Sequence, residues 1–251
     1  MGLDLALIGG TGLYDFPGLE NPERIRVDTP FGSPSAEIVR GTLHGKHVAF
    51  LARHGEQHAL APHRVNYRAN IWALHHLGAR AIVGINAVGG IRSDMGPRVL
   101  VVPEQIIDYT HGRLTSFCDV DGTKVEHIDF SEPYSSSMRT ALVAAAARAG
   151  IAVVAGGCYG ATQGPRLETA AEIARMRRDG CDLVGMTGMP EAVLARELSI
   201  EYACLALVAN WAAGCGEGGP AEPVSLPEIF ANLTAATAQV PVIIGELLIA
   251  S

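Results

Sequence analysis

The sequence predicts an α/β fold in which a largely parallel or mixed sheet lies between helices, over a single domain of residues 1–251. Short β-rich runs alternate with amphipathic helical patterns along the chain, which is typical of α/β proteins. The β-rich runs are nearly continuous in apolar character, as in strands buried on both faces. No linker, repeat or block of like charge divides the chain, and a hydrophobic content of 48% is ample for one core.

The expected strands are runs of β-branched and other apolar residues bounded by glycine, proline or polar residues. They cover residues 3–8, 47–52, 80–88, 98–104, 151–162, 182–186 and 202–209.

The helices are predicted from spacing and from capping residues. Residues 64–77 carry apolar side chains at i, i+4, i+7 and i+8, which places them on one helical face. Thr169 followed by Glu172 is a capping box for a helix over 170–178, and Pro190 suits the first turn of a helix over 190–198. The tail from about 224 to 250 has a helical pattern interrupted at Pro227 and again at Pro241.

Composition and charge exclude several classes of function. A net charge of −7 offers no basic face for a nucleic-acid backbone. The N-terminal residues lack a basic region and a cleavage signature, and no apolar run reaches the ~18 residues of a membrane span, so we expect a cytoplasmic protein. The five cysteines are scattered without a C-x-x-C pair, which favours reduced core thiols over disulfides or a zinc site.

A glycine-rich turn follows the first predicted strand, in "LIGGTGLYDF". Backbone N–H groups of such a turn can approach an anion, with the Thr11 hydroxyl as an additional donor. The same GGTG pattern also opens dinucleotide-binding Rossmann units, and a tight structural turn is a further alternative. Residues 14–35 contain four prolines and cannot form the regular crossover helix that a dinucleotide cradle requires, which argues against NAD(P) binding.

Polar residues also follow the second predicted strand, in "FLARHGEQH". Arg53 has the donor geometry that suits a phosphate, and His54 can add a hydrogen bond. His54 and His58 are alternatively metal ligands, but their spacing is not H-E-x-x-H and no further ligand cluster appears. Anion binding therefore ranks above metal binding, with a solvated polar loop as the structural alternative.

Two more strand ends carry residues of interest. Asn86 and Ala87 end the strand over 80–88, and Met186 and Thr187 stand between a strand and a helix start that leaves free N–H donors. Each turn alone has an ordinary structural explanation. Because ligands of α/β proteins bind beyond the carboxyl ends of strands, four such turns together predict an anion site.

These motifs carry a family resemblance over essentially the whole chain. The segments "IGGTGLYDF", "TPFGSPS", "RHGEQH", "VNYRANIWAL", "ATQGPRLET", "GMTGMPEAVLARE" and "VSLPEIFANL" resemble the trimeric purine nucleoside phosphorylase and methylthioadenosine phosphorylase family. The resemblance implies a single-domain fold with a mixed twisted sheet flanked by helices, and a homotrimer. It implies attack of phosphate on C1′ of a nucleoside with the purine as leaving group. Neither a metal nor an organic cofactor is implied, and inorganic phosphate is a co-substrate.

The resemblance also implies residue roles. Met186 matches the residue that lines the ribose, and Leu167 stands where relatives usually place a phenylalanine against the base. His127 corresponds to a residue that a neighbouring subunit lends to the 5′ end of the nucleoside; without the resemblance it is read as a surface histidine. The implied phosphate site comprises Thr11, Arg53, His54, Asn86, Ala87 and Thr187, with Asn86 in a position where methylthioadenosine enzymes usually have threonine.

The base site that the resemblance implies departs from that of related enzymes for 6-aminopurines, which carry aspartates at the positions of Asn210 and Ala212. The Asn210 amide can donate to O6 of a 6-oxopurine while its carbonyl accepts N7–H of the leaving base. Glu168 matches the inosine and guanosine phosphorylases, and its carboxylate can accept N1–H, which hypoxanthine has and adenine lacks. The structural alternatives are a turn residue for Asn210 and a favourable helix-end charge for Glu168.

The resemblance also implies a 5′ pocket, which is expected to favour a methylthio group over a hydroxyl. Leu226, Ile229 and Phe230 match positions that contact the 5′ substituent in the methylthioadenosine branch, and all are apolar. A methylthio group prefers such a lining by about 1–2 kcal/mol. Their spacing of i, i+3 and i+4 is equally that of a core stripe.

Together these features predict phosphorolysis of 5′-methylthioinosine to hypoxanthine and 5-methylthioribose 1-phosphate. Arg53, His54 and Thr187 are expected to hold phosphate beneath C1′, and Asn210 to stabilise the departing base. The alternatives are a methylthioadenosine phosphorylase, a general inosine/guanosine phosphorylase, a purine-binding protein without catalysis, and an NAD(P)-binding Rossmann protein.

Overall fold

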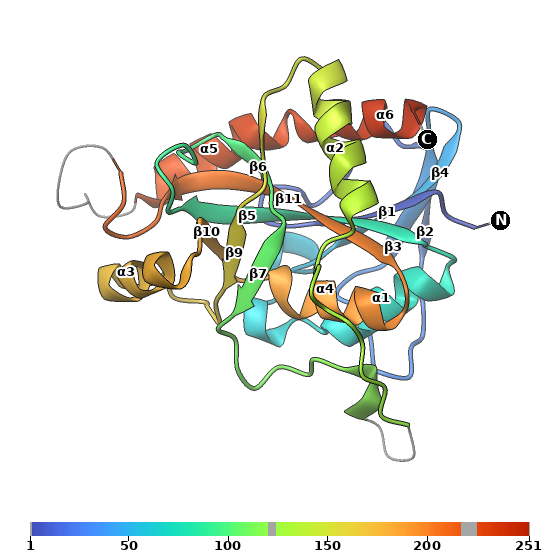
Figure 1. Cartoon of the computed structure of the whole chain (residues 1–251). Helices are drawn as coiled ribbons and strands as arrows, with labels where there is room; N and C mark the ends of the chain where they lie inside the picture. Colours follow the sequence, from blue (N-terminus) through green and yellow to red (C-terminus); the bar gives the residue numbers. More distant parts are fainter. Residues whose placement is uncertain (1, 120–123, 217–224, 251) are drawn as a thin grey trace.

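The computed structural model describes residues 2–119, 124–216 and 225–250, which fold around one large sheet (Figure 1). Its strands are β1 (Leu5–Gly9), β2 (Glu20–Ile25), β3 (Ile38–Leu43), β4 (Lys46–Ala52), β5 (Ala81–Gly90), β6 (Leu100–Val102), β7 (Gln105–Asp108), β8 (Val153–Ala155), β9 (Cys158–Ala161), β10 (Leu183–Gly185) and β11 (Glu201–Trp211). The helices are α1 (Tyr67–His76), α2 (Ser136–Arg148), α3 (Ala170–Asp179), α4 (Gly188–Glu197), α5 (Leu226–Thr237) and α6 (Val240–Ile249). Short 3-10 turns cover Glu56–His58, Pro62–Arg64 and Phe117–Asp119.

The sheet is mixed, which confirms the predicted fold class. Its main path runs β2-β3-β4-β1-β5-β10-β9-β7, and β11 branches from β5 toward β6 and β8. The pairs β1–β4, β1–β5 and β5–β11 are parallel, whereas β10 and β6 run antiparallel to β5 and β11. The carboxyl ends of β1, β4, β5 and β11 therefore meet at one edge of the sheet, where ligands of α/β proteins bind.

Helices cover both faces of the sheet (Figure 1). One apolar cluster joins α1 and α4 to the sheet through side chains such as Ile71 and Leu194. A second cluster on the opposite face includes Leu142 of α2, Leu233 of α5 and Ile243 of α6. The central strands are buried by both layers, which explains why their sequences are apolar at consecutive positions.

The structure contains every predicted strand and helix but differs in detail. The run over 151–162 is two strands, β8 and β9, because Gly156 and Gly157 turn the chain with φ of 108° and 104°. Sequence reasoning missed β2, β3, β7 and α2. Strand β2 is exposed along almost its whole length, so it carries no apolar pattern by which it could be found.

The sequence analysis found no apolar run of ~18 residues, but the C-terminal segment Leu226–Ile249 is long and apolar enough, by length and composition alone, to cross a membrane. Its 24 residues contain a window with a mean hydropathy of 1.4. In the fold this segment is two helices, α5 and α6, and 44% of that window is buried inside the protein. Pro227 and Pro241 both lie in a first helical turn, where proline is tolerated.

Candidate active site

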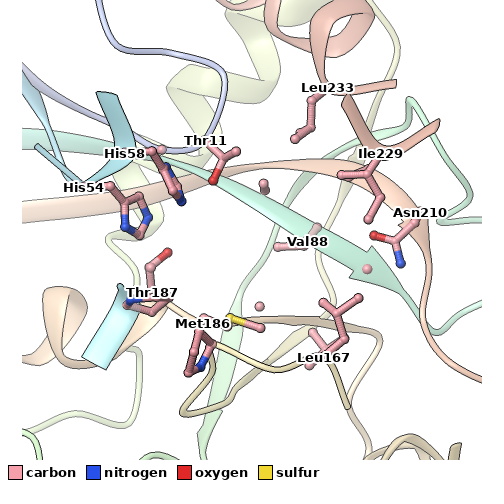
Figure 2. A pocket seen from close by; sticks show the side chains of 18 of the residues that line it. Thr11, His54, His58, Val88, Leu167, Met186, Thr187, Asn210, Ile229 and Leu233 are labelled. Carbon is pink, nitrogen blue, oxygen red and sulfur yellow. The ribbon is translucent and has the colours of Figure 1, made fainter. Parts of the chain in front are cut away.

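A cavity of about 540 Å³ opens at the carboxyl ends of β1, β4, β5 and β11 (Figure 2). This volume suits a small organic ligand. The residues that line it include Gly10, Thr11, Arg53, His54, His58, Ala87, Val88, Leu167, Glu168, Met186, Thr187, Asn210, Ala212, Leu226, Ile229, Phe230 and Leu233.

The sequence analysis gave fourteen residues a role in binding phosphate, ribose, base or 5′ group, and twelve of them line this cavity. Different kinds of side chain lie toward its two ends. Thr11, His54 and His58 lie toward one end in Figure 2, and Leu167 and Asn210 toward the other. Asn86 and His127 do not line it. The segregation of hydroxyl and imidazole groups from the amide end matches the arrangement expected for an anion beside a base.

Arg53 is fully buried, and its guanidinium forms an ion pair with Glu191 of α4. Its Nε donates to Glu191 Oε1, and its Nη2 donates to Glu191 Oε2 at 2.8 Å and to the Ile8 carbonyl at 3.4 Å. Nη1 donates to the Ile85 carbonyl at 2.8 Å. Burial lowers the pKa of Arg53, but attraction by Glu191 outweighs this effect and raises the pKa above its usual range.

The five guanidinium hydrogens decide what Arg53 can offer a ligand. Four are directed at protein acceptors, so one hydrogen on Nη1 is left for the cavity. The sequence analysis assigned Arg53 to phosphate for its donor geometry, but two-point binding of a phosphate by Arg53 does not fit this arrangement. Arg53 offers a single donor, and its charge is already paired with Glu191.

His54 is a buried neutral imidazole whose tautomer is fixed by the backbone. Its Nδ1 donates to the Leu60 carbonyl at 2.8 Å. Burial, together with the nearby Arg53 charge, lowers the pKa of His54 to about 4. At neutral pH the other ring nitrogen, Nε2, is therefore a hydrogen-bond acceptor, and no hydrogen bond links it to the described residues.

We expect His54 to make the folded protein less stable in acid. Its pKa is about 4 when folded and ~6.5 when unfolded, so the unfolded chain binds more protons between these values. The contribution is fully present above pH ~6.5 and falls by about 3 kcal/mol as the pH drops to ~4.

Urea unfolding of the wild type and of His54→Asn across pH 4 to 7 tests this expectation, because asparagine retains an N–H donor for the Leu60 carbonyl. The free energy of unfolding should depend less steeply on pH in His54→Asn. The exposed His63→Asn serves as the control. Equal slopes in all three proteins would contradict the role of His54.

His58 lies beside His54 and was considered from sequence only as a metal ligand. The two ring centroids are 4.4 Å apart, and the Tyr14 hydroxyl lies 3.2 Å from His58 Nδ1. Burial lowers the pKa of His58. Across residues 2–119, 124–216 and 225–250, no group of three or more His, Cys, Asp or Glu is placed to hold a metal ion.

Asn86 lies behind the cavity wall, so the structure corrects its predicted role as a direct phosphate ligand. It is fully buried on β5, and its Nδ2 donates to Thr187 Oγ1 at 2.7 Å. Because the Thr187 oxygen accepts this bond, the Thr187 hydroxyl hydrogen is free to point at a ligand in the cavity. The Cys204 thiol donates to Asn86 Oδ1 at 3.4 Å and helps to hold the amide in this orientation.

A β-bulge directs Asn210 into the other end of the cavity. Val208 pairs with Val88 and Asn210 pairs with Gly89, so Ala209 is an extra residue on β11. A bulge bends a strand and redirects its side chains, and here both Ala209 and Asn210 line the cavity. Asn210 Nδ2 donates one hydrogen to the Trp211 carbonyl at 2.6 Å, which leaves its second hydrogen and its Oδ1 available.

Glu168 lies in the loop before α3, directly after Leu167, and lines the cavity. The Thr162 hydroxyl donates to Glu168 Oε1 at 2.6 Å. The second carboxylate oxygen can accept from a ligand. The predicted capping box of α3 is present, with Thr169 and Glu172 bonded reciprocally, so the helix begins immediately after Glu168.

Helix α5 forms an apolar wall above the cavity. Leu226 and Phe230 are 62% and 55% exposed, and Ile229 is half-buried. Leu233, which the sequence analysis missed, continues this wall four residues after Ile229, and extension of the helical spacing would have found it. His127 lies on an exposed segment and contributes nothing to the cavity of its own chain.

The mixed sheet and its strand-end cavity define the class as an α/β protein with a small-molecule site at the carboxyl ends of its parallel strands. The sequence matches the phosphorylase superfamily over residues 4–242. The chain belongs to this family.

Individual members of this superfamily resemble the chain over most of its length. The chain is 59% identical over 243 residues to a protein of Xanthomonas campestris pv. campestris named probable S-methyl-5'-thioinosine phosphorylase, covering 97% of this chain and 96% of the relative. It is 47% identical over 215 residues to a 6-oxopurine nucleoside phosphorylase of Pyrococcus furiosus, covering 84% and 80%. The crystal structure of a methylthioadenosine phosphorylase from an antarctic soil metagenomic library superposes with a TM-score of 0.91 at 39% identity, covering 99% of this chain and 86% of that one.

Proposed function

We propose that this protein catalyses the phosphorolysis of 5′-methylthioinosine to hypoxanthine and 5-methylthioribose 1-phosphate. The observation that carries the proposal is the base end of the cavity, where Asn210 and Glu168 provide hydrogen-bond groups complementary to a 6-oxopurine. Relatives named for methylthioinosine and for 6-oxopurine nucleosides support the same choice of base.

The phosphate lies in this proposal at the end of the cavity formed by Thr11, His54 and Thr187. Thr187 donates its hydroxyl hydrogen, because its oxygen already accepts from Asn86. Arg53 adds one N–H, and the backbone around Gly10 and Thr11 adds further donors. These contacts would hold a phosphate oxygen close to C1′, so that attack on the sugar is intramolecular in effect.

The purine departs from the other end. Negative charge grows on the purine as its bond to C1′ breaks, and a proton taken up from solvent at N7, with hydrogen bonding at O6, neutralises it; overall this proton balances the one that hydrogen phosphate loses on becoming the sugar phosphate ester. The free Nδ2 hydrogen of Asn210 donates to O6, and its Oδ1 accepts N7–H. Glu168 accepts N1–H through the carboxylate oxygen that Thr162 does not occupy. A site with these polar groups can reject a mismatched base by ~10⁴-fold.

The 5′ substituent lies in this proposal against α5. Leu226, Ile229 and Phe230 present only apolar groups there, which favours methylthio over hydroxyl. Leu226 and Phe230 are more than half exposed in one chain, so the wall is open on one side. We propose that the chain assembles as a homotrimer in which His127 of a neighbouring subunit completes this wall.

The direct test is phosphate-dependent cleavage of methylthioinosine, methylthioadenosine and inosine, compared by kcat/KM. We expect methylthioinosine to exceed methylthioadenosine by orders of magnitude and inosine by about tenfold, the value of one or two buried carbon groups. A preference for methylthioadenosine would refute the assignment of the base. Equal rates for inosine and methylthioinosine would instead favour a general 6-oxopurine nucleoside phosphorylase.

A further inference from the structure

The bulge that presents Asn210 lies where β11 loses its second neighbour. Strand β6 pairs with β11 only at Ala206 and Leu207. Beyond them the Arg98 N–H donates to the Val208 carbonyl at 2.7 Å. The Val208 N–H in turn donates to the Val99 carbonyl at 2.9 Å, and Arg98 has a φ of 72°, an uncommon conformation for a residue other than glycine, so the pairing of this segment with β11 ends at Val208. The carbonyl of Ala209, the extra residue of the bulge, therefore lies past the last hydrogen bond between β11 and the segment that leads into β6.

Asn232 of α5 provides the missing partner for this carbonyl. Its Nδ2 donates to the Ala209 carbonyl at 2.9 Å. Its Oδ1 accepts from Nε of Arg98 at 2.8 Å. Because the guanidinium holds the amide oxygen, the NH₂ group of Asn232 is directed at Ala209. Asn232 thus fixes the residue immediately before Asn210 without lining the cavity itself.

We infer that Asn232 is a positioning residue for base recognition, acting through the Ala209 carbonyl on Asn210. The inference rests on the proposed function, because it concerns how Asn210 discriminates between bases. Asn232 lies on α5 between Ile229 and Leu233, which line the 5′ end of the cavity. The same helix therefore carries both residues that line the cavity and the residue that supports the strand end presenting Asn210.

The isosteric variant Asn232→Asp separates positioning from packing. Aspartate keeps the shape of the side chain and an oxygen for Arg98, but it has no hydrogen to donate to Ala209, so two oxygens face each other. Dissociation constants for hypoxanthine and adenine, measured by calorimetry in the presence of phosphate, give the base preference. We expect this preference to fall about tenfold, as for one lost hydrogen bond, while the KM for phosphate stays within about twofold.

Two further variants complete the test. Arg98→Met removes the group that orients the Asn232 amide, and we expect a loss of base preference in the same direction but about threefold. Arg98→Met also tests the positioning role of Asn232 if the Asn232→Asp variant does not fold. Thr234→Ala is the matched control, because Thr234 is exposed on the same helix and its hydroxyl bonds to the Phe230 carbonyl within that helix. It should leave the preference unchanged.

The outcomes distinguish this inference from the proposed function. If Asn232→Asp and Arg98→Met lower stability or total activity but keep the wild-type base preference, Asn232 is only structural and the inference is overturned. If the wild type prefers adenine, the proposed function fails, and the positioning role is still decided by whether that preference is lost in the variants. Loss supports it, and retention overturns it.

Discussion

Replacing Asn210 with aspartate is expected to lower kcat/KM for methylthioinosine by about 10²–10³, the range found when one hydrogen-bond donor to developing charge is removed. The carboxylate has no hydrogen for O6 and repels it, whereas Asn210 offers one free Nδ2 hydrogen. For an adenine nucleoside the change acts in the opposite direction, because the carboxylate accepts from N6–H and, when protonated, donates to N7. Steady-state rates with methylthioinosine and methylthioadenosine measure both effects.

A second variant separates a change of preference from a simple loss of activity. Asn210→Leu has a similar size but neither donor nor acceptor, so it should slow both substrates and bring their rates together. Asn210→Asp should instead move the ratio toward methylthioadenosine. If Asn210→Asp retained the wild-type ratio, or if the two variants gave the same ratio, Asn210 would not read the base.

Replacing Glu191 with alanine is expected to reduce the free energy of unfolding by about 3–5 kcal/mol, the cost of breaking a buried ion pair. Arg53 and Glu191 are both fully buried, so the Arg53 charge would be left without a partner. The Tyr202 hydroxyl, which donates to Glu191 Oε2 at 2.9 Å, would lose its acceptor as well. The shift of the urea unfolding midpoint at pH 7 measures the loss.

A double variant tests the cause of this destabilisation. In Arg53→Met with Glu191→Met no buried charge remains, so the double variant should be more stable than Glu191→Ala despite carrying two substitutions. If both proteins lost the same free energy, lost packing and not the unpaired charge would be responsible. The double variant should also lose phosphate-dependent activity, because Arg53 lines the cavity.

The sequence predicted most of the central fold and the composition of the cavity for one physical reason. Residues that follow apolar strands meet at a common edge when those strands are parallel, so Thr11, His54 and Asn210 come together although they are far apart in the chain. Strand β2 lies at the edge of the sheet and is exposed, so it lacks the apolar run that identifies a buried strand, and its neighbour β3 is buried at only two of its six positions.

Partners that are distant in sequence could not be predicted. Glu191 lies 138 positions from Arg53, and nothing in the local pattern of either residue indicates that they pair. The bulge at Ala209 is set by where the neighbouring strands end. Asn86 contacts Thr187 instead of the cavity because side chains of β5 point alternately to the two faces of the sheet. These features arise from tertiary packing, and they decide which polar atoms remain for a ligand.

The fixed tautomer of His54 has a consequence for the choice among oxyanions. An unprotonated Nε2 in the proposed phosphate site requires a hydrogen from the ligand, since Nδ1 already donates to the Leu60 carbonyl. Hydrogen phosphate carries such a hydrogen at neutral pH, whereas sulfate has the same shape and charge but none. The site can therefore discriminate between two tetrahedral dianions of nearly identical shape. Hydrogen phosphate donates a hydrogen bond to Nε2 of His54, whereas a sulfate oxygen would face the lone pair of this nitrogen and be repelled.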